Sequence, residues 1–238
     1  MSIFNSWISE EASDYATYYK DIVDFCGEPK YYLEYLEYIF RHKGLVCTAW
    51  KYICDTLCEL GFINEKDIDN INSLIITHDD SKLKRDEFYP YAKRFYGPCK
   101  NNKYVKTHFK EAVALHKSRN LHHYESLKSY KGKDWKNYAV ELICDYIAMG
   151  WEFNNYICEY FDKVKDELKN ELPDEYYAYI ESIIKVVQKK FELAEKPIDD
   201  DTIGWISYMY NYQNDPFENY DGSDDVILYC IPMEVYHK

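Results

Sequence analysis

Residues 74–82 read Leu-Ile-Ile-Thr-His-Asp-Asp-Ser-Lys, an apolar run that ends in the adjacent imidazole and carboxylate of His78 and Asp79. Charged groups that follow an apolar run into the interior destabilise a fold unless they are paired or bound to a metal. Neutral imidazole and carboxylate together are suitable ligands for Fe, Mn, Zn or Co. The stretch therefore predicts a helical protein built around a metal site, provided that other His and Asp residues occupy inward-facing helical positions.

The chain before this stretch predicts one long helix over residues 31–60. Its apolar residues recur at steps of three and four, and His42 falls on the same inward stripe. Gly61 follows the last periodic residue, at the usual C-cap position. A shorter helix is expected before it, over residues 10–25.

Helices are predicted for most of the remaining chain. Apolar periodicity places them over residues 65–79, 85–95, 103–120, 134–149, 154–170 and 174–195. Asp80 or Ser81 is expected to cap the second of these helices, since both residue types favour N-cap positions. The β-branched apolar run 225–231 fits either a short C-terminal strand or an extended segment packed on the helices. The predicted fold class is therefore all-α, with that strand as an open alternative.

The composition indicates a globular chain that does not track nucleic acid. Its 29 basic and 42 acidic residues give a formal charge of −13, which disfavours broad contact with a phosphate backbone. A small phosphorylated ligand stays compatible with the locally basic segments 82–110 and 117–136. The eight Cys residues form no Cys-x-x-Cys pair, the N-terminus has no signal-peptide pattern, and no apolar run could span a bilayer. We therefore expect a cytoplasmic protein with reduced thiols and no membrane partner.

Four inward-facing residues from three predicted helices make the main candidate site. The proposed metal ligands are His42, His78, Asp79 and Asp145. Helical bundles build metal sites from facing helices, and two His with two carboxylates leave coordination positions for water and substrate. Taken singly, each residue has another interpretation. An inward His is commonly a hydrogen-bonded core residue, and Asp145 could bond to a Tyr or an Arg.

A second set comprises His116, His122 and His123, with Asn120 beside them. These residues could bind a second metal, or act as a general acid and contact phosphate. His122 and His123 would point about 100° apart on a helix, so we expect at most one of them to line the site. The alternative is a hydrogen-bonded helix terminus with imidazoles at the surface, where we also place His108.

Lys82, Lys117 and Arg119 are candidate phosphate-binding cations. Lys82 is the strongest of the three because it lies within one turn of Asp79, whereas charge runs are usually solvated faces. Glu87 could supply a general acid or base. The Gly-poor sequence contains no phosphate-cradling loop, no nucleophile elbow and no dinucleotide-binding fingerprint.

The order His … His-Asp … Asp is spread over the chain, and four segments carry it together with its neighbouring residues. They are residues 41–43, residues 78–82 with 87–88, residues 116–125 and residues 141–145. In this order the chain resembles the HD-domain superfamily of metal-dependent phosphohydrolases, and more narrowly a small uncharacterised HD-like family of bacteria and phages. The third segment, His-Lys-Ser-Arg-Asn-Leu-His-His-Tyr-Glu, is the most specific. The resemblance covers about residues 38–150, and Asp80 departs from it, since an apolar residue is expected there.

The resemblance implies an all-helical HD-like fold and hydrolysis of a phosphomonoester or phosphodiester, often of a nucleotide. It implies metal ligation by the four residues of the main candidate site, which are His42, His78, Asp79 and Asp145. It further implies that His116 and one of His122 or His123 match the extra histidines of two-metal members.

We therefore predict an HD-like metal-binding core over residues 31–152, preceded by a helical segment 1–30 and followed by a helical C-terminal extension 153–238. The predicted function is hydrolysis of a nucleotide or other small phosphate ester with one or two divalent ions, from among Mn, Fe, Co, Mg and Zn. The expected catalytic residues are His116, His123, Lys82 and Glu87. The expected substrate-binding residues are Lys82, Arg119, Asn120 and His122.

Two other functions stay open. One is a catalytically silent HD-like module that binds a nucleotide or signalling molecule as a sponge or sensor. The other is a partner-binding protein that works through its Tyr-rich C-terminal third. A homo-oligomer is compatible with each of these functions.

Overall fold

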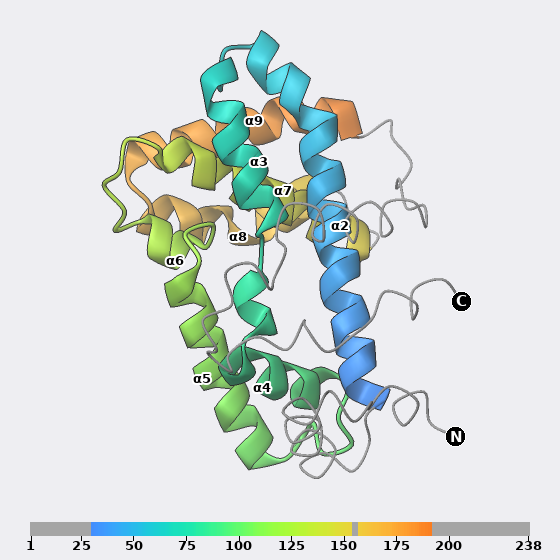
Figure 1. Cartoon of the computed structure of the whole chain (residues 1–238). Coiled ribbons are helices and arrows are strands. Elements are labelled where there is room, and N and C mark those ends of the chain that lie inside the picture. The colour runs from blue at the N-terminus through green and yellow to red at the C-terminus, as the bar shows by residue number, and fades with distance from the viewer. Residues whose placement is uncertain (1–29, 154–156, 192–238) are drawn as a thin grey trace, which may run out of the picture.

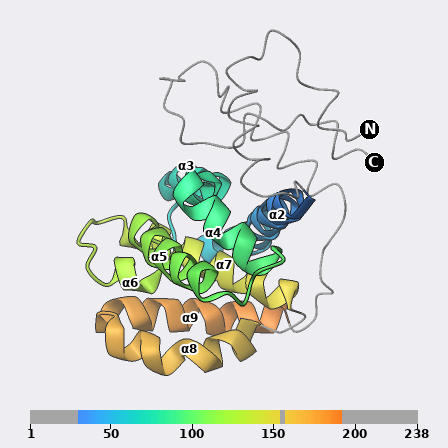
Figure 2. The ribbon, with the colours of Figure 1, turned by 90° about the horizontal axis from the view of Figure 1, so that it is seen from below.

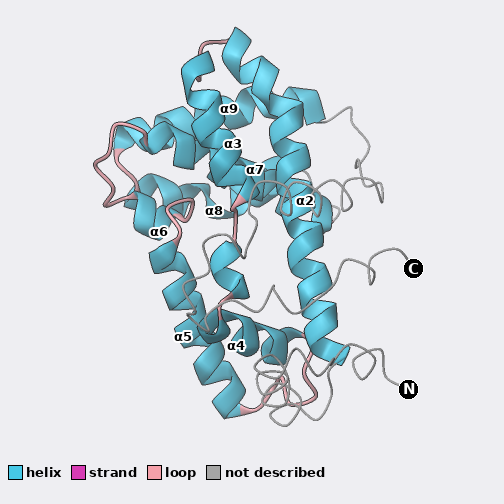
Figure 3. Cartoon of the chain, in the orientation of Figure 1, coloured by secondary structure: helices cyan, strands magenta, loops and turns pink. Residues whose placement is uncertain are grey.

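The computed structural model describes residues 30–153 and 157–191 (Figure 1). Within these ranges the protein is all-α, as predicted, and contains no strand (Figure 3). The helix expected over residues 10–25 and the apolar run 225–231 lie outside the described residues.

The long helix predicted over residues 31–60 is α2 (Lys30–Glu59). Burial of its inward stripe against the other helices stabilises it, and the stripe consists of aromatic and aliphatic residues at helical spacing. The helix ends with the N–H of Phe62 donating to the carbonyl of Leu57 at 2.9 Å, the hydrogen bond of a Schellman motif. Gly61 allows this ending because its φ of +73° lies in the left-handed region, where a side chain would be strained.

The helix that leads to the His-Asp pair is shorter than predicted. It consists of η3 (Glu65–Asp67) and α3 (Ile68–Ile76), after which the chain turns. Asp79 has φ 61° and ψ 13°, a left-handed conformation that costs a non-glycine residue roughly 1–2 kcal/mol. Residues held in such conformations are concentrated at functional sites. The prediction of one helix through residue 79 is therefore wrong at its C-terminal end.

The turn leads through η4 (Asp80–Leu83) into α4 (Arg85–Phe95). Lys84, with an extended backbone, takes the N-cap position of α4. The predicted capping by Asp80 or Ser81 is wrong, because both residues lie inside η4.

The next helices are α5 (Lys103–Arg119), α6 (Tyr124–Leu127) and α7 (Trp135–Glu152). The side chain of Asn102 caps α5 by accepting a backbone hydrogen bond. Because α5 ends at Arg119, residues 120–123 form a turn rather than a further helical turn.

The central helix of the described chain is α7, which packs against α2 and α3 on one side and against α8 (Ile157–Glu171) and α9 (Asp174–Phe191) on the other. Figure 2 shows α8 and α9 lying side by side beneath α7, and α4 and α5 pack against each other. Side chains of α8 and α9 join the same hydrophobic cluster as α2 and α7, and Ile180 and Leu168 are fully buried in it.

The cysteines that the structure describes are free thiols: Cys47 and Cys144 are buried, Cys54 and Cys58 partly buried, and Cys99 exposed. Among the described helices, none combines the length and apolar character needed to cross a lipid bilayer.

Candidate metal centre

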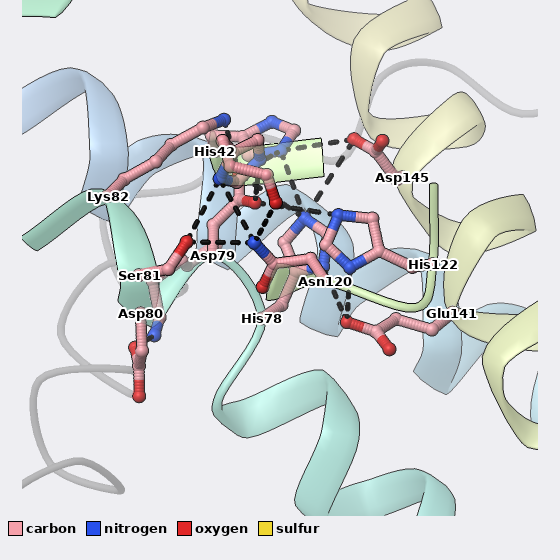
Figure 4. Close-up of polar contacts among 12 residues, drawn as sticks. His42, His78, Asp79, Asp80, Ser81, Lys82, Asn120, His122, Glu141 and Asp145 are labelled. Carbon is pink, nitrogen blue, oxygen red and sulfur yellow. Dashed lines mark hydrogen bonds and ion pairs between the residues drawn. The ribbon is translucent and has the colours of Figure 1, made fainter. Parts of the chain in front are cut away.

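Three parts of the fold bring the four predicted metal ligands together (Figure 4). His42 comes from α2, His78 and Asp79 from the turn after α3, and Asp145 from α7. The Nε2 atom of His42 lies 3.2 Å from Asp145 Oδ1, 3.3 Å from His78 Nε2 and 3.6 Å from Asp79 Oδ2. The Nε2 atom of His78 lies 3.5 Å from Asp79 Oδ2 and 3.9 Å from Asp145 Oδ1. We call these four residues the first ligand group.

The separations among His42, His78 and Asp145 suit a single cation, because their ligand atoms all lie within 4.8 Å of one another, and Asp79 Oδ2 lies beside the two histidines. Ligand atoms about 2.1 Å from a metal are about 3.0 Å apart at octahedral angles and about 3.4 Å apart at tetrahedral angles. The observed range of 3.2–3.9 Å is close to both values. His42, His78 and Asp79 are each no more than 2% exposed, so the donors are largely removed from water. These residues could hold a divalent metal ion.

The other oxygen of Asp79 faces a second ligand group, formed by Asp79, His116, His122 and His123. Asp79 Oδ1 lies 3.1 Å from His116 Nε2 and 3.5 Å from His122 Nε2, and the ligand atoms of the group lie within 4.8 Å of one another. Asp79 Oδ1 and the Nε2 atoms of all three histidines are buried and form no hydrogen bond within the described residues. Buried polar atoms without partners are costly, and a shared cation would satisfy all four.

Both His122 and His123 belong to the second ligand group, whereas the sequence predicted at most one. That prediction assumed a helix at this point. The turn over residues 120–123 frees the two imidazoles from helical geometry, and their ring centres are 4.3 Å apart. His108 belongs to neither ligand group, and its ring lies 3.9 Å from that of Tyr104 between centres, tilted by 42°.

Glu141 orients one histidine of each ligand group. Its Oε1 atom accepts hydrogen bonds from His78 Nδ1 at 2.9 Å and from His122 Nδ1 at 3.0 Å. With Nδ1 bound to the carboxylate, each imidazole turns its Nε2 toward Asp79, an arrangement typical of metal-binding histidines. The sequence pattern assigned no role to Glu141. The available signal was its position on α7, one helical turn before Asp145.

Glu87 performs the same task for His116. It is fully buried and accepts hydrogen bonds from His116 Nδ1, Ser81 Oγ and Arg119 Nη1, each at 2.8 Å. Burial alone would raise the pKa of this carboxyl group, but His116, Arg119 and Ser81 hold it below its usual value. The structure thus places Glu87 behind His116, with its carboxylate engaged, rather than facing a substrate as a general acid or base.

The predicted phosphate-binding cations have different surroundings. Lys82 Nζ lies 2.5 Å from Asp79 Oδ2, directly beside the first ligand group. Arg119 instead pairs with Glu87 and with Asp86, at 2.5 Å from the latter, so the structure does not bring it to the ligand groups as a substrate-binding residue. Lys117 likewise pairs with a carboxylate, that of Glu125.

Asn120 joins the turn after α5 to the His-Asp turn. Its Nδ2 atom donates to Ser81 Oγ at 2.8 Å and to the carbonyl oxygen of His116 at 2.7 Å (Figure 4). The amide is therefore occupied in holding the two turns together at the edge of the second ligand group.

Asp80, which departs from the resembled family, is neutralised within the protein. It forms an ion pair with Lys43, whose side chain is only 1% exposed. Lys43 follows His42 on α2 and Asp80 follows Asp79, so the pair joins two of the three segments that form the first ligand group. The ammonium of Lys43 thereby balances the additional negative charge that Asp80 places beside the site.

The electrostatic environment separates the two neighbouring histidines. Burial opposes protonation of His122, but Glu141 and the aspartates raise its pKa to about 9. Burial and the adjacent His122 and His116 lower the pKa of His123 to about 2. His123 therefore stays neutral, which is the form that binds metal.

Comparison with known proteins supplies a family but no activity. A family model described as "Family of unknown function (DUF5662)" matches residues 32–186, a span that contains every residue of both ligand groups. Neither the curated proteins nor the solved structures include a match to this chain.

Proposed function

The chain belongs to the family of unknown function DUF5662, and we propose that it is a metal-dependent phosphohydrolase acting on a nucleotide or another small phosphate ester. The observation that carries this proposal is the convergence of the first ligand group, in which the Nε2 atom of His42 lies 3.2 Å from Asp145, 3.3 Å from His78 and 3.6 Å from Asp79. We further propose kinship with the HD-domain superfamily. The order His … His-Asp … Asp and the all-helical bundle support it.

In this proposal Asp79 serves both ligand groups. Its Oδ2 atom faces His42 and His78, and its Oδ1 atom faces His116 and His122. One or two ions from among Mn, Fe, Co, Mg and Zn would be held there. When bound, such an ion polarises a phosphoryl oxygen and lowers the pKa of bound water toward about 7.

The remaining residues would position the substrate and complete the second ligand group. The ammonium of Lys82 would neutralise phosphate charge next to Asp79. His123 is the histidine of the second ligand group that no carboxylate orients within the described residues, and its Nε2 atom has no hydrogen-bond partner there. Because His123 stays neutral, we assign it to metal binding in the second ligand group rather than to protonation of the leaving group.

A hydrolysis panel tests the proposal. The purified chain is supplied with Mn²⁺, Co²⁺, Mg²⁺ or Zn²⁺ and offered nucleotides and simple phosphate esters, alongside Asp145→Asn and the surface control Asp162→Asn on α8. We expect metal-dependent release of phosphate or nucleotide product by the wild type and the control, with a loss of at least about 100-fold in Asp145→Asn. Equal hydrolysis by both variants would overturn the assignment. Stoichiometric nucleotide binding without turnover would indicate a binding module instead.

A further inference from the structure

Lys82 lies near the ring of Tyr91 as well as beside Asp79. Its Nζ atom is 5.8 Å from the ring centre of Tyr91, on α4. Its positive charge also acts on the phenol of Tyr38, on α2, and opposes the effect of burial on the pKa of that group. Lys82 therefore carries its charge into a space bordered by α2 and α4.

Each of these tyrosines packs on a histidine of a different ligand group. The ring of Tyr38 stacks on His42 at 6.1 Å between centres, with 9° between the ring planes. The ring of Tyr91 meets His116 edge-on, at 6.0 Å and 73°. Each of the two tyrosines therefore packs against one ligand group.

A third tyrosine lies between them. Tyr35 is fully buried, and its ring centre is 6.2 Å from that of Tyr38 and 6.1 Å from that of Tyr91, with 16° between the planes in both cases. The phenols of Tyr35 and Tyr91 both lie in the field of Asp79 and Glu87. All three side chains therefore belong to one cluster around the His-Asp turn.

The hydroxyl group of Tyr35 is wholly buried and forms no hydrogen bond within the described residues. Tyr176 and Tyr179 contrast with it, since they donate to backbone carbonyls at 2.9 Å and 3.0 Å. A buried hydroxyl without a partner costs roughly 1–3 kcal/mol. A phenol is protonated at neutral pH and can donate a hydrogen bond.

We propose that the hydroxyls of Tyr38 and Tyr91, with the ammonium of Lys82, form an oxyanion subsite that holds the phosphoryl oxygens of the substrate, and that Tyr35 supports it from behind. Two hydroxyl donors and one ammonium are complementary to the oxygens of a tetrahedral oxyanion. The inference rests on the proposed hydrolase function, for which it names the residues that would decide anion binding.

Conservative substitutions test the subsite without removing the rings that pack on His42 and His116. The full-length chain is supplied with Mn²⁺ and titrated calorimetrically with inorganic phosphate, and bound manganese is measured on the same samples. The variants are Tyr38→Phe, Tyr91→Phe and their combination, with Tyr176→Phe on α9 as the control. We expect unchanged manganese content in all of them, and a loss of phosphate affinity of about tenfold for each subsite hydroxyl removed.

The two readouts separate the subsite from the hydrolase. Phosphate affinity in Tyr38→Phe/Tyr91→Phe within twofold of the wild type would overturn the subsite and leave the metal centre intact. A wild-type chain that binds manganese but no phosphate would overturn the subsite as well. If the chain retains no manganese but binds phosphate through these hydroxyls, the result would support the subsite and contradict the metal-dependent hydrolase function.

Discussion

Glu141 accepts a hydrogen bond from the Nδ1 atom of His78 at 2.9 Å, across 63 positions of sequence. The same oxygen accepts from His122 at 3.0 Å, so one carboxylate fixes the orientation of a histidine in each ligand group. The carboxylate is 5% exposed and therefore interacts strongly with both imidazoles. This shared acceptor links the two ligand groups as directly as Asp79 does.

Replacing Glu141 by Gln should weaken metal binding while preserving the fold. The amide has the size of the carboxylate but lacks its charge, and it can orient the two imidazoles less strongly. We expect metal affinity to fall by about 10–100-fold. Calorimetric titration with Mn²⁺ and Zn²⁺ gives the affinity, and circular dichroism confirms the helical content.

The matched control for this variant is Glu181→Gln on α9, where the carboxylate pairs only with exposed or half-buried partners. The control should bind metal as the wild type does. Equal affinities for Glu141→Gln and Glu181→Gln would show that Glu141 does not orient metal ligands.

The ion pair of Lys43 and Asp80 should contribute measurably to stability. Removing the ammonium by Lys43→Met leaves the Asp80 carboxylate without this partner beside the acidic site. Breaking a buried pair typically costs about 3–5 kcal/mol, and we expect a value near the lower limit because Asp80 is 31% exposed. Urea denaturation measures the change in the free energy of unfolding.

Adding Asp80→Asn to Lys43→Met tests the cause of that loss. If the unpaired carboxylate is responsible, the double variant should recover a large part of the lost free energy of unfolding. Strictly additive destabilisation by the two changes would show that the pair is not coupled.

Tyr35→Phe should not destabilise the protein. Its hydroxyl is buried without a hydrogen-bond partner in the described chain, so removing it removes a desolvation cost and leaves ring packing unchanged. The expected free energy of unfolding equals or exceeds that of the wild type. A loss above about 1 kcal/mol, by the same urea method, would mean that the hydroxyl has a partner and cannot support the proposed subsite.

Local sequence signals were sufficient for most of the helical framework. The bounds of α2, α4 and α5 agree with the predictions to within one residue, because apolar spacing and Gly61 act over short stretches of chain. The burial of His42 followed from the same periodicity.

The features that the sequence did not predict depend on contacts between distant segments. Asp79 adopts a left-handed conformation that no local pattern favours, and Glu141 is shared between His78 and His122, 63 and 19 positions away. Spacing identifies the inward face of a helix, but it does not specify which side chain across the core will pair with it. The pairing of Arg119 with Asp86 and Glu87 was missed for the same reason.

The metal content of Asp79→Asn tests the central claim most directly, because one oxygen of Asp79 faces each ligand group. Wild type and variant are purified without chelator, supplied with Mn²⁺ and Zn²⁺, and analysed for bound metal per chain, with circular dichroism confirming that both are folded. We predict one or two tightly bound ions in the wild type and a loss of most of that metal in Asp79→Asn. A wild-type chain without bound metal, or a folded Asp79→Asn chain with the same metal content, would contradict the account.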